Sequence, residues 1–131
     1  MVASSFNWSD FLELAKQLQR AGSESSYRTA ISRAYYAAFH PARAYVLTRH
    51  GQFLEKRSEH DQTWGRFARS NDAEESQLGQ WGNDLKRLRV NADYHLNRAT
   101  GSREVLTTLN YANKIIQQIE KFRSNAEPSA E

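Results

Sequence analysis

The chain is 131 residues long with 39% hydrophobic and 25% charged residues, which suits one globular domain with a buried core and is too short for two. It has no cysteine, which excludes disulfides, thiolate metal sites and cysteine nucleophiles, and no apolar run close to the ~20 residues of a membrane span. The first residues lack the basic and apolar regions of a signal peptide, so we expect a cytoplasmic protein, and the formal net charge of +3 permits nucleic-acid binding without requiring it.

A first helix is expected to begin after Ser9 or Asp10, because either side chain can cap the free N–H groups of a first turn. Gly22 is expected to end it, since glycine readily adopts the left-handed conformation found after helices. The apolar residues between these points share one face at helical spacing: Phe11, Leu12, Ala15 and Leu18.

The second predicted helix, near residues 24–49, has an alanine at every fourth position: Ala30, Ala34, Ala38 and Ala42. Apolar residues accompany this row on two flanks: Tyr27, Ile31, Tyr35 and Tyr45 on one, and Tyr36 and Phe39 with Arg43 on the other. Small side chains let a neighbouring helix approach closely, and two apolar flanks are typical of a central or interface helix. Pro41 lies inside the pattern, so we expect a kink or break just before it.

Three further helices are expected. The stretch GQFLEKR is a predicted connection, and a short helix capped by Ser58 follows it with His60, Trp64 and Phe67. After RSND, helical patterns extend over about 72–97 and 102–123. The predicted fold class is all-α, an antiparallel up-down four-helix bundle with an additional short helix, in a helical domain over 1–123. The polar segment 124–131 is expected to be a disordered tail.

The fourth predicted helix carries an arginine and a histidine six positions apart, Arg89 and His95. On a wheel with 100° per residue they lie on opposite borders of an apolar stripe made of Leu78, Trp81, Leu85, Leu88, Ala92 and Leu96. Six residues also separate them by about 9 Å along the axis. Within one straight helix they do not converge, but a kink or a two-fold partner could bring them together.

The residue types and spacing leave two interpretations of this pair open. Arg89 can form an ordinary i,i+4 ion pair with Asp93, with His95 as a packing residue, or the two can be catalytic. An arginine followed after four to six intervening residues by a histidine occurs three times, where chance placement gives about one. The three pairs are Arg33 with His40, Arg43 with His50, and Arg89 with His95. Spacing by itself therefore does not choose among them.

Two longer stretches supply a context. The segments SYRTAISRAYYAAFHPARAYVL (26–47) and LKRLRVNADYHL (85–96), with SEHDQTWGRF (58–67) between them, resemble the HEPN (higher eukaryotes and prokaryotes nucleotide-binding) domain family in order and spacing. The resemblance implies an all-helical bundle that usually forms a homodimer. It also implies that Arg89 and His95 on the fourth helix can build a metal-independent RNA-cleaving site at the dimer interface. Many members are toxins or defence proteins beside a nucleotidyltransferase-like antitoxin, and others are non-catalytic modules that bind a partner protein or nucleotide.

As an endoribonuclease, the protein would use the substrate's own 2′-hydroxyl as nucleophile, with His95 transferring protons and Arg89 stabilising the charge on the phosphate. We expect no metal and no cofactor. Four residues are predicted as auxiliaries for RNA binding or catalysis: Asn91, Asp93, Tyr94 and Arg33. Tyr94 is in addition the first candidate for silencing by nucleotide transfer from an antitoxin.

Overall fold

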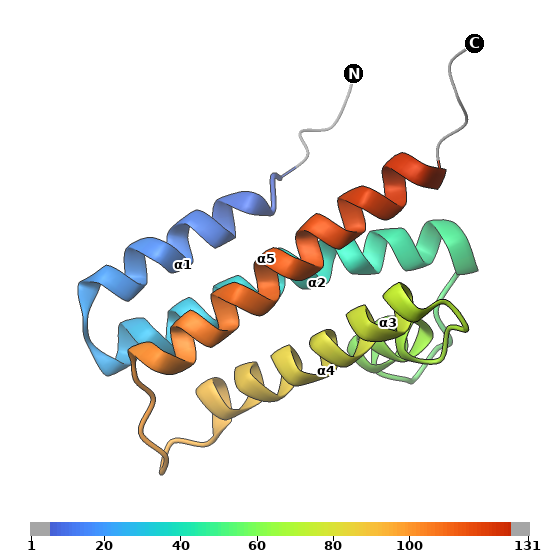
Figure 1. Cartoon of the computed structure of the whole chain (residues 1–131). Coiled ribbons are helices and arrows are strands. Elements are labelled where there is room, and N and C mark those ends of the chain that lie inside the picture. The colour runs from blue at the N-terminus through green and yellow to red at the C-terminus, as the bar shows by residue number, and fades with distance from the viewer. Residues whose placement is uncertain (1–5, 127–131) are drawn as a thin grey trace.

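The computed structural model describes residues 6–126, which form five helices and no strand (Figure 1). The helices are α1 (Ser9–Ala21), α2 (Glu24–His50), α3 (Glu59–Ala68), α4 (Ala73–Tyr94) and α5 (Ser102–Ala126). The long helices α1 and α4 run opposite to α2 and α5, and the short α3 packs beside α4. The predicted all-α bundle with an additional short helix is confirmed.

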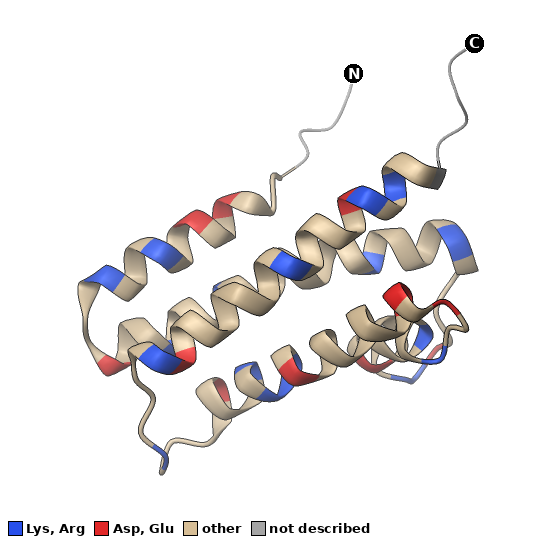
Figure 2. Ribbon diagram, in the orientation of Figure 1, with Lys and Arg blue, Asp and Glu red and all other residues tan. Residues whose placement is uncertain are grey.

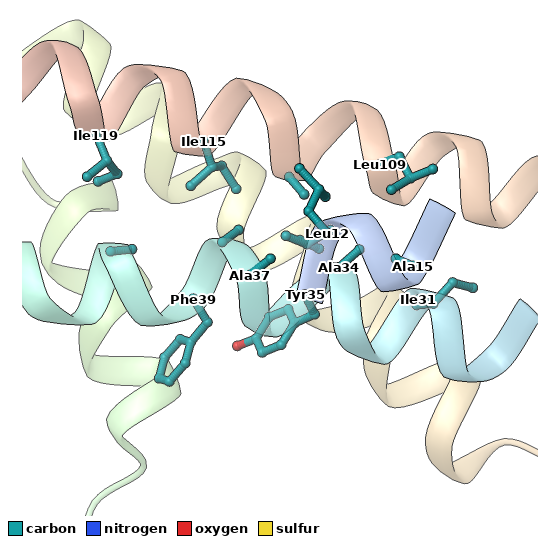
Figure 3. Close-up of a cluster of buried hydrophobic side chains, with 14 of the residues drawn as sticks. Leu12, Ala15, Ile31, Ala34, Tyr35, Ala37, Phe39, Leu109, Ile115 and Ile119 are labelled. Atoms are coloured by element: carbon teal, nitrogen blue, oxygen red, sulfur yellow. The ribbon is translucent and has the colours of Figure 1, made fainter. Parts of the chain in front are cut away.

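Helix α2 lies at the centre of the bundle and packs against each of the other four helices. All four alanines of its predicted row are fully buried, at 0% exposure. Because these side chains are small, α5 can approach α2 closely and place Ile115 and Ile119 against it. Figure 3 shows these two isoleucines on one side of α2, with Tyr35 and Phe39 pointing to the other side.

The ends of α1 are set by residues on either side of it. The N-cap position is Trp8, which makes no side-chain cap, and the side-chain oxygen of Asn7 before it accepts a hydrogen bond from the backbone N–H of Ser9 at 3.1 Å. The predicted caps, Ser9 and Asp10, are instead the first two residues of the helix. Gly22 ends α1 as predicted, with a left-handed φ of 79°.

Of the kink or break predicted just before Pro41, the break does not form, and α2 continues as one helix to His50. Proline removes one backbone hydrogen bond, but it leaves the rest of the ladder intact. Buried residues on both sides of it, including Ala38 and Ala42, anchor the two halves in the same core. Tertiary packing thus holds the helix through the proline.

Ser58 caps α3 as predicted, accepting a hydrogen bond from the backbone N–H of Asp61. The last helix begins at Ser102 as expected and continues through Ala126, three residues into the predicted tail. The rest of that predicted tail, residues 127–131, lies outside the described residues. The larger difference concerns α4, which ends at Tyr94 rather than near residue 97.

Candidate functional site

Arg89 lies on α4 where this helix faces α2, and its side chain is only 11% exposed. Its guanidinium lies over the rings of Tyr35 and Tyr36, 5.1 and 5.8 Å from their centroids. Nη1 of Arg89 is 3.6 Å from Oδ2 of Asp93, the ion pair that the i,i+4 spacing indicated. The buried Nε has no hydrogen-bond partner among residues 6–126. Arg89 is therefore a cation held between aromatic rings and a carboxylate, with a buried Nε that has no hydrogen-bond partner among the described residues.

His95 follows the last helical residue of α4 and has a non-helical backbone, with φ of −99° and ψ of 73°. The prediction that it lies on the fourth helix is wrong, so its position on the helical wheel does not apply. Leu96, predicted in the apolar stripe, is 73% exposed. His95 is also exposed, and no hydrogen bond joins it to Arg89 within the described part of the chain.

A residue of α2 fixes the end of α4. Nη1 of Arg28 donates to the backbone oxygens of Asn91 at 3.3 Å and Ala92 at 2.8 Å, and Nη2 donates to that of Arg98. Glu24 accepts from Nε at 3.0 Å and from Nη2 at 2.8 Å, so all five guanidinium donors are used. A cation at these carbonyls is favourable because the C-terminal end of a helix is partly negative. Arg28 thereby sets where the chain leaves α4.

The predicted auxiliary residues do not gather at one place: Asn91, Asp93 and Tyr94 are on α4, whereas Arg33 is on α2. Asn91 helps to line a hollow of about 290 Å³ between α4 and α5, away from α2. Tyr94 is 70% exposed. Arg33 lies with its guanidinium 5.1 Å from the centroid of an aromatic ring on α1. Of these four predicted residues, only Asp93 contacts Arg89.

The structure instead brings a different histidine to Arg89. Nδ1 of His60, on α3, lies 2.6 Å from the hydroxyl oxygen of Tyr35, the residue whose ring Arg89 covers. Trp64 Nε1 donates to the same oxygen at 3.0 Å, so we assign the hydroxyl proton to the bond with His60. The imidazole also stacks on Phe39, with ring centroids 4.1 Å apart. We refer to Arg89, Tyr35, Trp64 and His60 as the Tyr35 network.

The Tyr35 network keeps its histidine uncharged. Burial lowers the pKa of His60 to about 4, with further contributions from the positive charges of Arg89 and Lys86. With Nδ1 assigned as the acceptor from Tyr35, the neutral ring carries its proton on Nε2. A neutral donor near a partly satisfied guanidinium suits an anion such as a phosphate group.

The sequence indicated that His60 would be on the third helix but gave no sign of its partner. The hydrogen bond to Tyr35 spans 25 residues of sequence, and no helical spacing rule predicts a contact of that kind. The only available signal was the position of two tyrosines beside the alanine row. That signal correctly indicated burial of Tyr35 but not its hydrogen bonds.

Among residues 6–126, no group of three or more His, Asp or Glu side chains gathers in a way that could hold a metal ion. Within the same residues, none of the helices combines the length and apolar character required to span a membrane.

The chain was compared with family sequence models, with curated proteins and with solved structures, and a family model matches. Neither the curated protein sequences nor the solved structures contain a match to this chain. The sequence model of the HEPN domain matches residues 9–122, which include all of α1, α2, α3 and α4 and most of α5. HEPN domains are often ribonucleases or nucleotide-binding modules, and they often dimerise. The match covers well over half of the chain, which therefore belongs to the HEPN domain family.

Proposed function

We propose that this HEPN domain is a metal-independent endoribonuclease that acts as a homodimer, with Arg89 and His95 as its catalytic pair. The observation that carries the proposal is the state of Arg89. Its guanidinium is anchored by two tyrosine rings at the α2–α4 contact, and its buried Nε is unused. A cation held in a fixed position can stabilise the charge that develops on a scissile phosphate.

The proposed reaction needs no group besides the RNA and the protein. The 2′-hydroxyl oxygen attacks the adjacent phosphorus, its proton passes to His95, and the bond from phosphorus to the 5′-oxygen breaks. The departing 5′-oxygen takes up a proton from water and His95 returns its proton to the solvent, which leaves a 2′,3′-cyclic phosphate and a 5′-hydroxyl. Arg89 stabilises the negative charge that develops on the phosphate oxygens. DNA lacks the nucleophile and is not cleaved.

A second copy of the chain is part of the proposal because one chain does not bring the two residues into contact. Arg89 faces α2, whereas His95 lies in the exposed turn beyond α4. In a two-fold dimer, any residue pair that meets across the interface does so twice. The exposed turn of one copy would then supply His95 to the Arg89 of the other.

The test is incubation of the purified protein with mixed cellular RNA in EDTA. We expect cleavage with cyclic-phosphate ends, reduced about 100-fold or more in Arg89→Ala and in His95→Ala. Arg87→Ala and His50→Ala are matched controls, because both residues are exposed and neither belongs to the proposed pair. Cleavage that survives both site substitutions in folded protein would contradict the assignment.

The second candidate is a non-catalytic HEPN module that binds a partner protein or nucleotide. It is favoured by the low exposure of the Arg89 side chain, 11%, and by its ion pair with Asp93, which competes with a substrate phosphate. A folded dimer that leaves RNA intact in the same assay would support this candidate. A toxin or defence role, with an antitoxin acting on Tyr94, stays a prediction from the sequence; the identity of the neighbouring gene tests it.

A further inference from the structure

A basic hollow lies beside α3, at the end of the bundle where α2 finishes. It has a volume of about 440 Å³ and is formed by α3, the connection before it and the residue after it. Its lining residues are Leu54, Arg57, Ser58, Asp61, Gln62, Arg66 and Arg69. Figure 2 shows basic residues of α3 and of the preceding connection close together in this region. We call this feature the α3 hollow.

Hydrogen bonds within the chain hold the walls of the α3 hollow in place. Gln62 binds the backbone of Leu54 twice, accepting from its N–H at 2.8 Å and donating to its oxygen at 3.1 Å. Arg66 donates to the backbone oxygens of Gly51 and Gln52, each at 3.2 Å. These bonds tie the first half of the connection, residues 51–54, to α3, so the hollow is part of the folded structure.

The charge of the α3 hollow is strongly positive. Its lining contains three arginines and one carboxylate, that of Asp61. Lys86 of α4 forms an ion pair with Asp61, which offsets the only negative charge. Arg57 and Arg69 are exposed, and neither takes part in an ion pair within residues 6–126. Both guanidinium groups are therefore available to a ligand.

The lining favours phosphodiester groups over a free nucleotide. Pockets for nucleotide-sized molecules are usually lined mainly by apolar and aromatic side chains, on which a base can stack. Leu54 is the single apolar residue in this lining, and no aromatic residue is among the seven. Arginines without a stacking surface suit the phosphates of a nucleic-acid backbone.

The α3 hollow also adjoins the surface that carries Arg89. Asp61 in its lining follows His60 of the Tyr35 network directly in sequence. Lys86, the partner of Asp61, lies one helical turn before Arg89 on α4. A single strand bound at Arg89 can therefore continue over α3 without crossing the bundle.

We propose that the α3 hollow is a binding site for the phosphate backbone of the RNA substrate, in which Arg57 and Arg69 bind phosphates next to the group held at Arg89. The inference rests on the proposed ribonuclease function and adds a sequence-independent substrate contact to it. Arg66 forms a fixed wall of the site.

The experiment measures binding of a fluorescent single-stranded 2′-O-methyl RNA of about 20 nucleotides, which lacks the free hydroxyl needed for cleavage. We compare wild type with Arg57→Gln/Arg69→Gln at several salt concentrations. If each arginine contacts one phosphate, the slope of log affinity against log salt falls by about 0.7 per arginine, or about 1.4 in the double variant. Arg20→Gln/Arg123→Gln is the matched control, because it removes the same charge at exposed positions on α1 and α5.

Weaker binding and a smaller salt slope in the first double variant alone support the proposal. Equal losses in both double variants, or no change in either, overturn it, since binding would then follow net charge or another surface. If wild type cleaves cellular RNA while Arg57→Gln/Arg69→Gln binds the probe like wild type, the proposed role of the α3 hollow is wrong and the ribonuclease function stands. If wild type neither binds the probe nor cleaves RNA, both proposals fail. Circular dichroism checks that both double variants are folded.

Discussion

At the scale of single residues, Tyr35 joins the interior of the bundle to its surface through one hydroxyl group. That hydroxyl accepts from Trp64, which is completely buried, and contacts the partly exposed His60. Arg89 covers the face of the same ring. Burial raises the pKa of the Tyr35 hydroxyl well above its ordinary value, so it stays protonated and continues to orient His60 at physiological pH.

His60 makes the stability of the protein depend on pH. Its pKa falls from 6.5 to about 4 on folding, so between these values the unfolded chain binds a proton that the folded chain does not. Stability is therefore fully present above pH 6.5 and decreases as the pH falls toward 4. We expect the free energy of unfolding to decrease less between pH 7 and pH 5 in His60→Gln than in wild type, as measured by denaturant titration at each pH.

The control for this measurement is His50→Gln, at the exposed end of α2, which should keep the wild-type pH dependence. His40 remains in both variants, and it also makes the protein less stable at low pH, because burial lowers its pKa. The variants are therefore compared by how steeply the free energy of unfolding of each changes with pH. Identical slopes in wild type and His60→Gln would contradict the role of His60.

At the scale of helices, α3 and α4 approach each other through glycines. A Cβ at Gly82 would lie 2.0 Å from Cε3 of Trp64, and a Cβ at Gly79 would lie 2.2 Å from the backbone nitrogen of Ala68. Neither neighbour can move easily: Trp64 is fully buried and donates to the Tyr35 hydroxyl, and the atom of Ala68 belongs to the backbone of α3. These two glycines set the distance between the helices and, through Trp64, the position of His60.

We expect Gly82→Ala to lower the free energy of unfolding by about 1–3 kcal/mol, because the added methyl group overfills the contact with Trp64. Gly65→Ala is the matched control: it also lies within a helix, but its Cβ would meet the flexible end of Arg69. The control should be neutral or up to about 1 kcal/mol more stable, since alanine favours helix. Urea unfolding of both variants measures the difference, and equal stabilities would show that the contact can relax.

Most helix positions could be predicted from the sequence because local rules determine them. The alanine row of α2 is buried, and Gly22 and Ser58 mark helix ends as expected. The end of α4 could not be predicted, since it is set by Arg28 from a helix some sixty residues earlier. Leu96 has the spacing of a stripe residue, yet it lies beyond that end. The sequence indicated Arg89 as a candidate residue. It did not indicate His60, because the residues that His60 contacts, Tyr35 and Phe39, come from α2.

At the scale of the whole molecule, α2 contacts every other helix, and one side of it carries the Arg89 site. The proposed site, shared across a two-fold axis, makes a specific prediction about mixed dimers. We expect Arg89→Ala and His95→Ala protein, each inactive alone, to recover roughly a quarter of wild-type cleavage when unfolded and refolded together. Half of the randomly formed dimers are then heterodimers, and each has one intact site.

Cleavage that stays at background after mixing, with heterodimers present by native mass spectrometry, would place Arg89 and His95 in the same chain's site or outside any site. The control mixture pairs Arg89→Ala with itself under the same refolding conditions. Any activity there would indicate contamination.

The guanidinium of Arg28 also bears on the order in which the molecule folds. Its contacts join the first turn of α2 to the last turn of α4 and to the turn beyond it, across 63 to 70 positions of sequence. Contacts between such distant positions form slowly, because the entropy lost on closing a long loop must first be offset by other interactions. During synthesis, the turn that carries His95 therefore acquires its final shape only after α4 has docked on α2. The proposed nuclease site is therefore completed only after these two helices have packed together.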